Sequence, residues 1–346
     1  MARLLIVDGH AYAYRAFHAI RELRAPTGQP TNAIYGFIKM LAKMRATLAP
    51  THLIVVWDGG LSAERMTALP EYKAQRPEMP AELGRQIDDI VRYLDAANIA
   101  SVCQEGVEAD DYIACLARRA LNVDMEAVIA SSDKDFMQLV TSDEWRVTSD
   151  EKPAVQSRHP PPVTRHPTRI GLLNPNDKTE TVWTADQVRA KTGVEPSQIV
   201  DWLSLIGDSV DNIPGVPGVG PKTAADLLRQ FGSVEALYGR LPEVTSARLR
   251  TALTAAAEAV RRNRELVRLR EDLPCEFSPD EMADQPADAG RLAALFRQWG
   301  FRSLLAELES GKVSGAKGQA SGERGSNLAP DTTHLTPSQD GQPVLL

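Results

Sequence analysis

The chain has 346 residues, 43% hydrophobic and 25% charged, which is the composition of a soluble globular protein with one large domain or two modest ones. Its three cysteines have no paired spacing and its first apolar run is short, so a disulfide scaffold and a membrane protein are excluded and a cytoplasmic setting is expected. The net charge of −7 does not exclude a nucleic-acid partner, because residues 222–270 hold ten Lys or Arg against five Asp or Glu.

Short apolar runs at 4–8, 53–58 and 127–135 each end in aspartate, and each predicts a strand buried on both faces of a parallel sheet. Apolar residues at a helical period alternate with these runs, and Thr31 is a candidate N-cap. The predicted helices cover 31–48, 81–98 and 109–121. This alternation predicts a doubly wound α/β sheet.

The rest of the chain divides by composition. Residues 59–80 have little apolar periodicity and predict a mobile loop or weak helix. The proline-rich stretch 151–169 predicts an irregular insertion. We therefore expect a core over 1–184, a helical region over 185–310 and a disordered tail over 311–346.

Nine acidic residues lie at predicted strand ends, at a predicted helix start and before a glycine-rich loop. They are Asp8, Asp58, Glu108, Asp110, Asp111, Asp133, Asp135, Asp208 and Asp211. The carboxyl ends of parallel strands meet at one edge of a sheet, so most of these side chains are expected to gather there. Helical spacing places Glu108 and Asp111 on one face and Asp110 about 100° from Asp111, so some of the acids would act indirectly.

Such a cluster requires bound cations or large pKa shifts, because two like charges about 4 Å apart repel by roughly 4 kcal/mol at an effective dielectric near 20. Oxygen ligands without His or Cys favour Mg²⁺ or Mn²⁺, and a pair of such ions suits phosphodiester hydrolysis. Taken singly, each acid is equally well explained as a cap or turn former, and the combination favours the metal site.

The loop PGVPGVGPKTA, at 214–224, predicts a phosphate contact through backbone N–H groups at a helix start, or else a plain helical corner. Its candidate DNA-binding residues are Gly215, Gly218, Gly220, Lys222 and Thr223. A cation near the metals would neutralise charge on a scissile phosphate. The candidates are Lys73, Arg15 and Arg76, with Tyr72 beside them as a further DNA contact. The arginines of 261–270 are explained equally well as a phosphate track or as a solvated helix face.

Several stretches in a fixed order resemble the 5′ nucleases, the family that includes the N-terminal 5′→3′ exonuclease domain of bacterial DNA polymerase I, phage exonucleases and flap endonucleases. They are IVDGHAYAYRAFHA, PTGQPTNAIYGF, VVWDGG, PEYKAQRPEMP, GVEADDYIACLA, SSDKDFMQL, GDSVDNIPGVPGVGPKTAADLL and FRSLLAEL. They cover 1–150 and 180–308, nearly all of the chain expected to be ordered.

The resemblance implies a PIN-like α/β core, a helical arch over 59–98 that passes a 5′ single strand, and a helix–three-turn–helix element at 207–230 that grips duplex DNA, in many members with K⁺. It implies that Asp135, Asp208 and Asp211 serve a second metal and the other six acids mostly a first. It assigns Lys73 and Arg15 to the scissile phosphate. We expect a monomer that acts on 5′ flaps and on nicked or branched DNA.

Three departures from the family pattern stand out. Glu64 replaces the aromatic residue before the arch arginine, Arg65, which puts contacts with the single strand in question. The second departure is the insertion at 151–169, which is unusual for the family. The third is that the chain stops soon after FRSLLAEL. We therefore expect a stand-alone 5′→3′ exonuclease and flap endonuclease without polymerase activity. The alternatives are a weakly active or inactive paralogue that binds branched DNA and a metal-dependent phosphatase, against which the 214–225 loop argues.

Overall fold

The computed structural model describes residues 2–141, 169–177 and 181–311. The predicted insertion, apart from residue 169, and the predicted tail beyond residue 311 lie outside the described residues. Among the described residues, no helix has both the length and the apolar character needed to cross a membrane.

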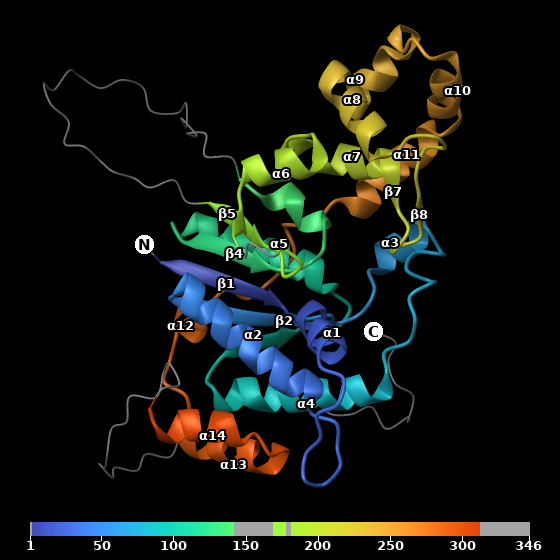
Figure 1. Cartoon of the computed structure of the whole chain (residues 1–346). Helices are drawn as coiled ribbons and strands as arrows, with labels where there is room; N and C mark the ends of the chain where they lie inside the picture. Colours follow the sequence, from blue (N-terminus) through green and yellow to red (C-terminus); the bar gives the residue numbers. More distant parts are fainter. Residues whose placement is uncertain (1, 142–168, 178–180, 312–346) are drawn as a thin grey trace, which may run out of the picture.

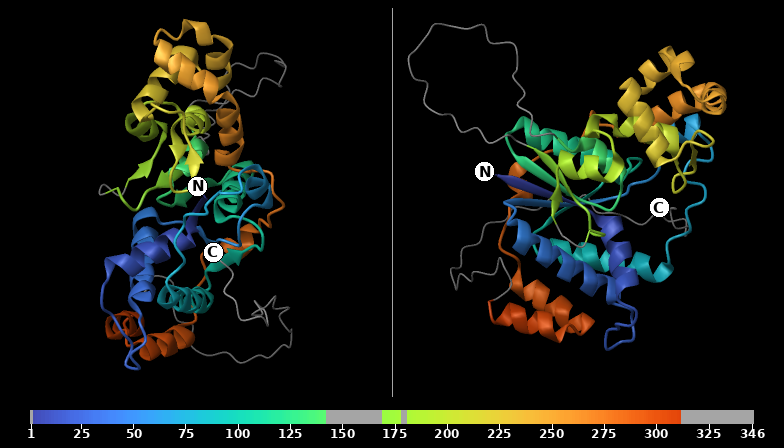
Figure 2. Two further views of the ribbon diagram at one scale, coloured as in Figure 1. Left: turned by 90° about the vertical axis from the view of Figure 1, so that its right-hand side faces the viewer. Right: turned by 45° about the horizontal axis from the view of Figure 1, so that its top comes forward.

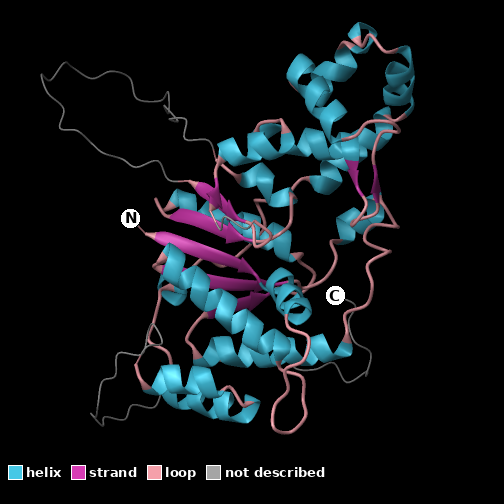
Figure 3. Ribbon diagram, in the orientation of Figure 1, coloured by secondary structure: helices cyan, strands magenta, loops and turns pink. Residues whose placement is uncertain are grey.

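A six-stranded sheet forms the centre of the molecule (Figure 3). Its strands, in the order in which they lie side by side, are β3 (Ala100–Cys103), β2 (His52–Trp57), β1 (Arg3–Asp8), β4 (Glu126–Ala130), β5 (Ile170–Leu173) and β6 (Val182–Trp183). All neighbours are parallel except β5 and β6. The predicted parallel α/β sheet is therefore confirmed, with an antiparallel edge strand added.

Helices cover both faces of this sheet (Figure 1). Along β1, Leu4 and Ile6 belong to one apolar cluster and Leu5 and Val7 to another, because successive side chains point to opposite faces. One face packs against α1 (Gly9–Ala19), α2 (Asn32–Leu48) and α4 (Ala81–Ala96), and the other against α5 (Ala109–Asn122). The continuous apolar composition of the predicted strands follows from this double burial.

Two details of the predicted elements differ in the structure. The third predicted strand, which is β4, ends at Ala130 and not at Asp135. The Ser131 and Asp133 side chains accept bonds from backbone N–H groups that a longer strand would use, and Asp135–Leu139 form a 3₁₀ helix, η1. Thr31 occupies the N-cap position of α2, as predicted, but its side chain makes no capping bond. The side-chain oxygen of Gln86 (Oε1) accepts from Ala33 N at 2.7 Å instead of the Thr31 hydroxyl.

A second group of helices extends from one end of the sheet (Figures 1 and 2). It consists of α6 (Ala185–Thr192), α7 (Ile199–Ile206), α8 (Pro221–Phe231), α9 (Val234–Gly239), α10 (Ala247–Ala255) and α11 (Ala257–Val267), with short 3₁₀ turns η2 (Pro196–Gln198) and η3 (Leu241–Glu243). A small hairpin, β7 (Gly207–Asp208) and β8 (Ile213–Pro214), joins α7 to α8. Pro221 is the first residue of α8, so the predicted helix start at the glycine loop is confirmed.

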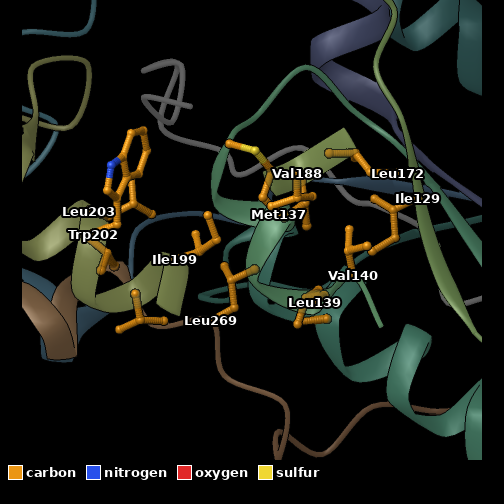
Figure 4. Close-up of a cluster of buried hydrophobic side chains, with 14 of the residues drawn as sticks. Ile129, Met137, Leu139, Val140, Leu172, Val188, Ile199, Trp202, Leu203 and Leu269 are labelled. Atoms are coloured by element: carbon orange, nitrogen blue, oxygen red, sulfur yellow. The ribbon is translucent and has the colours of Figure 1, made fainter. Parts of the chain in front are cut away.

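One apolar cluster connects the sheet to these helices (Figure 4). Ile129 of β4 and Leu172 of β5 lie in the same cluster as Ile199 and Leu203 of α7, with Leu269 from the segment after α11. The helical group and the sheet therefore share a continuous core.

The chain then returns to the opposite end of the sheet. After α11 it passes through α12 (Pro279–Met282), where Ala283 forms a bridge to His52 at the start of β2. Helices α13 (Ala289–Trp299) and α14 (Arg302–Glu309) pack against α2 and α4, with Phe301 against Tyr35 and Phe296 against Tyr93. The last two helices of the 185–310 segment thus lie on the core and not with α6–α11 (Figure 2).

Candidate metal centre and active site

The strand order brings the ends of β1 and β4 together where the direction of winding reverses, which is where doubly wound sheets bind ligands. Asp8, the last residue of β1, accepts a bond from Ala11 N at 3.0 Å and caps α1. Its other oxygen accepts from Ser131 Oγ at 2.7 Å, and Ser131 Oγ accepts from Asp133 N at 3.1 Å. Burial raises the pKa of Asp8 to about 6. Ser131 therefore couples the acids that follow β1 and β4.

A second group of acids comes from η1 and the β7–β8 hairpin. One oxygen from each of Asp135, Asp208 and Asp211 lies within 4.8 Å of the others. Asp135 Oδ1 is buried and has no hydrogen-bond partner among the described residues. Burial, followed by the neighbouring charge of Asp133, raises the pKa of Asp135 well above its ordinary value. An unpartnered buried oxygen among three converging carboxylates fits a hard divalent cation.

Asp133 and Asp110 connect the two groups. Burial raises the pKa of Asp133, and the charges of Asp211 and Asp208 raise it further. Burial likewise raises the pKa of Asp110 well above its usual value, with a further contribution from Asp133. The acids therefore form one continuous field of negative charge along the carboxyl edge of the sheet.

Asp58 follows β2 at the same edge. Its backbone N–H donates to His10 Nδ1 at 3.1 Å, and burial raises the pKa of its carboxyl group while the Lys73 charge opposes that rise. Burial lowers the pKa of His10 to about 4, so the ring is neutral at pH 7. His10 therefore supports the backbone beside Asp58.

Asp111 differs from the other acids because both of its oxygens bind one cation. Arg65, from the short helix α3 (Ala63–Ala68), donates to Asp111 through Nη1 and Nη2, each at 2.8 Å. Asp111 Oδ1 also accepts from Arg270 N at 2.9 Å. Arg65 further donates to the Leu266 and Arg268 carbonyls at 3.0 and 2.9 Å. This pair ties α3, α5 and the end of α11 together.

Glu108 is also paired. Its Oε2 accepts from Lys73 Nζ and from the Tyr72 hydroxyl, and its Oε1 accepts from Ser62 N and lies 3.2 Å from Arg65 Nη1. Burial alone would raise the pKa of Glu108, but Lys73 and Arg65 outweigh it and the pKa is lowered. Glu108 and Asp111 thus share the Arg65 side of α5 while Asp110 interacts with Asp133, which is the division expected from helical spacing.

Two further cations contact the second group. Arg76 Nη2 lies 2.7 Å from Asp211 Oδ1, and Lys134 Nζ lies 2.5 Å from Asp208 Oδ2. Arg76 was a candidate from the sequence, whereas Lys134 was missed. Its position between Asp133 and Asp135 was the available signal.

Two of the predicted residues have partners that were not expected. Arg15 is exposed, and its guanidinium donates to Asn176 Oδ1 at 2.5 Å instead of pairing with an acid of the cluster. Tyr72 was expected on a DNA-facing surface, but its side chain is 3% exposed and its hydroxyl is used by Glu108. The centre of its ring lies 4.9 Å from Lys73 Nζ, so the buried ring makes a cation–π contact with the Lys73 ammonium group.

The glycine loop between β8 and α8 combines close packing with exposure. A Cβ on Gly215 would overlap the Ile206 carbonyl, whereas Gly218 has φ +82° and open space around it. Gly220 and Lys222 are exposed, and Thr223 is half-buried, at the start of α8. The Trp202 indole N–H donates to the Pro221 carbonyl at 3.0 Å and holds the helix start in place.

We expect Gly215→Ala to destabilise the protein by about 1–3 kcal/mol, because the new methyl group must displace backbone atoms and not a flexible side chain. Urea unfolding measures this. Gly239→Ala in α9 is the control: its Cβ meets nothing within 4 Å, and the effect should stay within about 1 kcal/mol. Equal stability of the two variants would contradict the close packing at Gly215.

Comparison with known proteins agrees with this geometry. Residues 3–163 match the model of the 5′–3′ exonuclease N-terminal resolvase-like domain, and residues 194–290 match that of the 5′–3′ exonuclease C-terminal SAM fold. The 5′–3′ exonuclease of Aquifex aeolicus is 35% identical over 310 residues, which cover 89% of this chain and 96% of that protein. This chain belongs to the 5′–3′ exonuclease family.

Other members of this nuclease family are longer. DNA polymerase I of Bacillus caldotenax is 38% identical over 308 residues, which cover 89% of this chain and 32% of that protein. The exonuclease chain thus spans about a third of the length of the DNA polymerase I relatives that it matches.

Solved structures support the fold of this family member. The T5 D15 protein co-crystallised with metal ions has a TM-score of 0.58 at 21% identity, covering 88% of this chain and 99% of that one. The catalytic core of Rad2 in complex with DNA substrate has a TM-score of 0.56 at 16% identity, covering 88% and 91%. The predicted PIN-like fold with a following helical region is confirmed.

Proposed function

We propose that this family member hydrolyses DNA phosphodiester bonds as a 5′→3′ exonuclease and 5′-flap endonuclease, with two divalent cations. The observation that carries the proposal is the arrangement of the acids in two adjoining groups, one of which leaves a buried carboxylate oxygen without a partner among the residues that the structure describes. Repulsion within such a cluster is relieved when cations bind.

The residues divide between the two cations by position. Asp8, Asp58, Asp110 and Asp133, with Glu108, would hold the first, and Asp135, Asp208 and Asp211 the second. The ligands are all carboxylates, which favours Mg²⁺ or Mn²⁺. Bound there, the cations would supply Lewis-acid polarisation of the scissile phosphate. Asp111 has no free oxygen while Arg65 and Arg270 N engage it, so we assign it to holding Arg65.

Lys73 and Arg76 are the proposed phosphate-binding cations. Burial alone would lower the pKa of Lys73, but Asp110, Glu108 and Asp211 raise it, so the ammonium group stays charged and acts as a cation and not as a base. Both side chains contact carboxylates now, and they would transfer to phosphate oxygens when DNA and metal neutralise those acids.

The helices beyond Ala185 provide the proposed duplex contact. The exposed backbone of Gly218 and Gly220 and the start of α8 suit a phosphate, and a K⁺ ion at this turn would add to that contact. The structures of the T5 D15 flap endonuclease with DNA and metal ions and of Rad2 with DNA substrate support DNA as the partner. We propose 5′ flaps and nicked or branched duplexes as substrates, for a monomer in the cytoplasm.

The test is cleavage of end-labelled 5′-flap, nicked and single-stranded DNA with Mg²⁺ or Mn²⁺. We expect release of products from the 5′ end, with a preference for the flap, and complete loss of cleavage in EDTA. Uncut flap DNA under conditions in which the protein binds it would overturn the proposed activity and favour the weakly active paralogue. Cleavage in EDTA would overturn the role of the carboxylates.

A further inference from the structure

Two segments about 140 residues apart in sequence meet through their backbones beside the acid cluster. The turn after α3, at 69–76, carries Lys73 and Arg76, and the β7–β8 hairpin carries Asp208 and Asp211. Lys73 N donates to the Asp211 carbonyl at 3.0 Å, and Asn212 Nδ2 donates to the Glu71 carbonyl at 2.9 Å. The two segments are therefore joined by a reciprocal pair of hydrogen bonds.

The same two residues have unusual backbones. Lys73 has φ 56° and Asn212 has φ 57°. Both values lie in the left-handed backbone region, which residues other than Asn, Asp and Gly seldom adopt. Asparagine tolerates that backbone and also carries a donor, whereas aspartate would present only acceptors to the Glu71 carbonyl. Asn212 thus satisfies two requirements that few other residues combine.

The packing between these two segments leaves a pocket. A cavity of about 410 Å³ lies between the segments, lined by Leu69 and Glu71 on one side and by Asp208, Asn212 and Ile213 on the other. Among the described residues, the other direct tie between the two segments is the ion pair of Arg76 with Asp211, in which the Arg76 side chain is 34% exposed. Exposed pairs hold geometry weakly, so the hydrogen bond from Asn212 fixes the spacing of the two segments.

We propose that Asn212 is a positioning residue that sets the place of Lys73 relative to Asp208 and Asp211. It fixes the Glu71 carbonyl two residues before Lys73, while its own left-handed backbone presents the Asp211 carbonyl to Lys73 N. The cation for the phosphate and the acids of the second group are thereby held as one unit. This inference rests on the proposed nuclease activity.

The test compares Asn212→Gly with a matched control. Glycine keeps the left-handed backbone and removes only the amide. Asn98, in the turn between α4 and β3, offers the control. It also has a left-handed backbone, with φ 51°, and its Nδ2 donates to the Pro286 carbonyl at 2.5 Å. With Mg²⁺ and a 5′-flap substrate, we expect Asn212→Gly to lower the single-turnover rate by about 10- to 100-fold. Its flap-DNA dissociation constant should stay within about threefold, and Asn98→Gly should cleave like wild type.

A double-mutant cycle with Lys73→Ala separates positioning from a general structural effect. If Asn212 acts through Lys73, adding Asn212→Gly to Lys73→Ala should slow cleavage less than about threefold further. Wild-type rates for Asn212→Gly, or full multiplication of the two effects, would overturn the inference while leaving the proposed function intact. An inactive wild-type protein would overturn the proposed function and this inference with it.

Discussion

Replacing Asp135 with asparagine should reduce cleavage of a 5′-flap substrate by at least about 10²- to 10³-fold while leaving DNA binding largely unchanged. Asp135 converges with Asp208 and Asp211, and its Oδ1 is buried without a hydrogen-bond partner among the described residues. The amide keeps the size of the side chain but removes the charge that a divalent cation requires. Flap cleavage in Mg²⁺ and flap binding in Ca²⁺ measure the two effects.

The same substitution should stabilise the metal-free protein. Three carboxylates share this space, and their mutual repulsion is relieved when one becomes an amide that can donate to the others. We expect a higher melting temperature for Asp135→Asn in EDTA and a smaller rise than wild type when Mg²⁺ is added. Wild-type cleavage, or an unchanged response to Mg²⁺, would remove Asp135 from the metal site.

Replacing Arg65 with methionine should lower the free energy of unfolding by about 3–5 kcal/mol, because the Asp111 carboxylate is left buried without its cation. Arg65 is 6% exposed, and the Leu266 and Arg268 carbonyls lose their donor as well. Urea unfolding in EDTA measures the change, without any contribution from bound metal.

Two variants provide the comparison for Arg65. Arg270→Met removes an exposed partner of Glu64, and such a pair contributes about 0–1 kcal/mol. Asp111→Asn should destabilise the protein in EDTA, whereas Asp135→Asn should stabilise it, although both remove one buried acid of the predicted set. The same sign for both acids would contradict their division into a paired and a metal-binding residue.

The sequence predicted much of this architecture because its signals are local. Leu83, Ile90 and Leu94 recur at a helical period and are fully buried in α4. Aspartates at the carboxyl ends of β1 and β2 mark the edge at which the acids gather. Such a strand end can be recognised from a run of five or six apolar residues that stops at an aspartate. The position of the acid cluster therefore followed from patterns that need no tertiary contact.

What the sequence did not show depends on distant contacts. Arg65 meets residues 46 and about 200 positions away, so no local pattern separates Asp111 from the acids that remain without a cation. Ser131 donates to Asp8 of β1, and Lys134 donates to Asp208 of β7, so the roles of both residues depend on contacts with other elements. The Tyr72 side chain is buried, and its hydroxyl donates to Glu108, which is 36 residues away. Residue type identified the chemistry, and packing decided which partner each group received.

The path of the chain has a mechanical consequence. The helices α6–α11 leave the sheet after β6, and the chain comes back at 268–270, where its backbone is held by Arg65 and Asp111. The two chain connections are not the only attachments of this body, because a shared apolar cluster and the bonds between the 69–76 turn and the β7–β8 hairpin also hold it against the sheet. The distance from these helices to the acid cluster is therefore fixed at several separate points, and a cut in the returning segment at 268–270 would leave the other points in place.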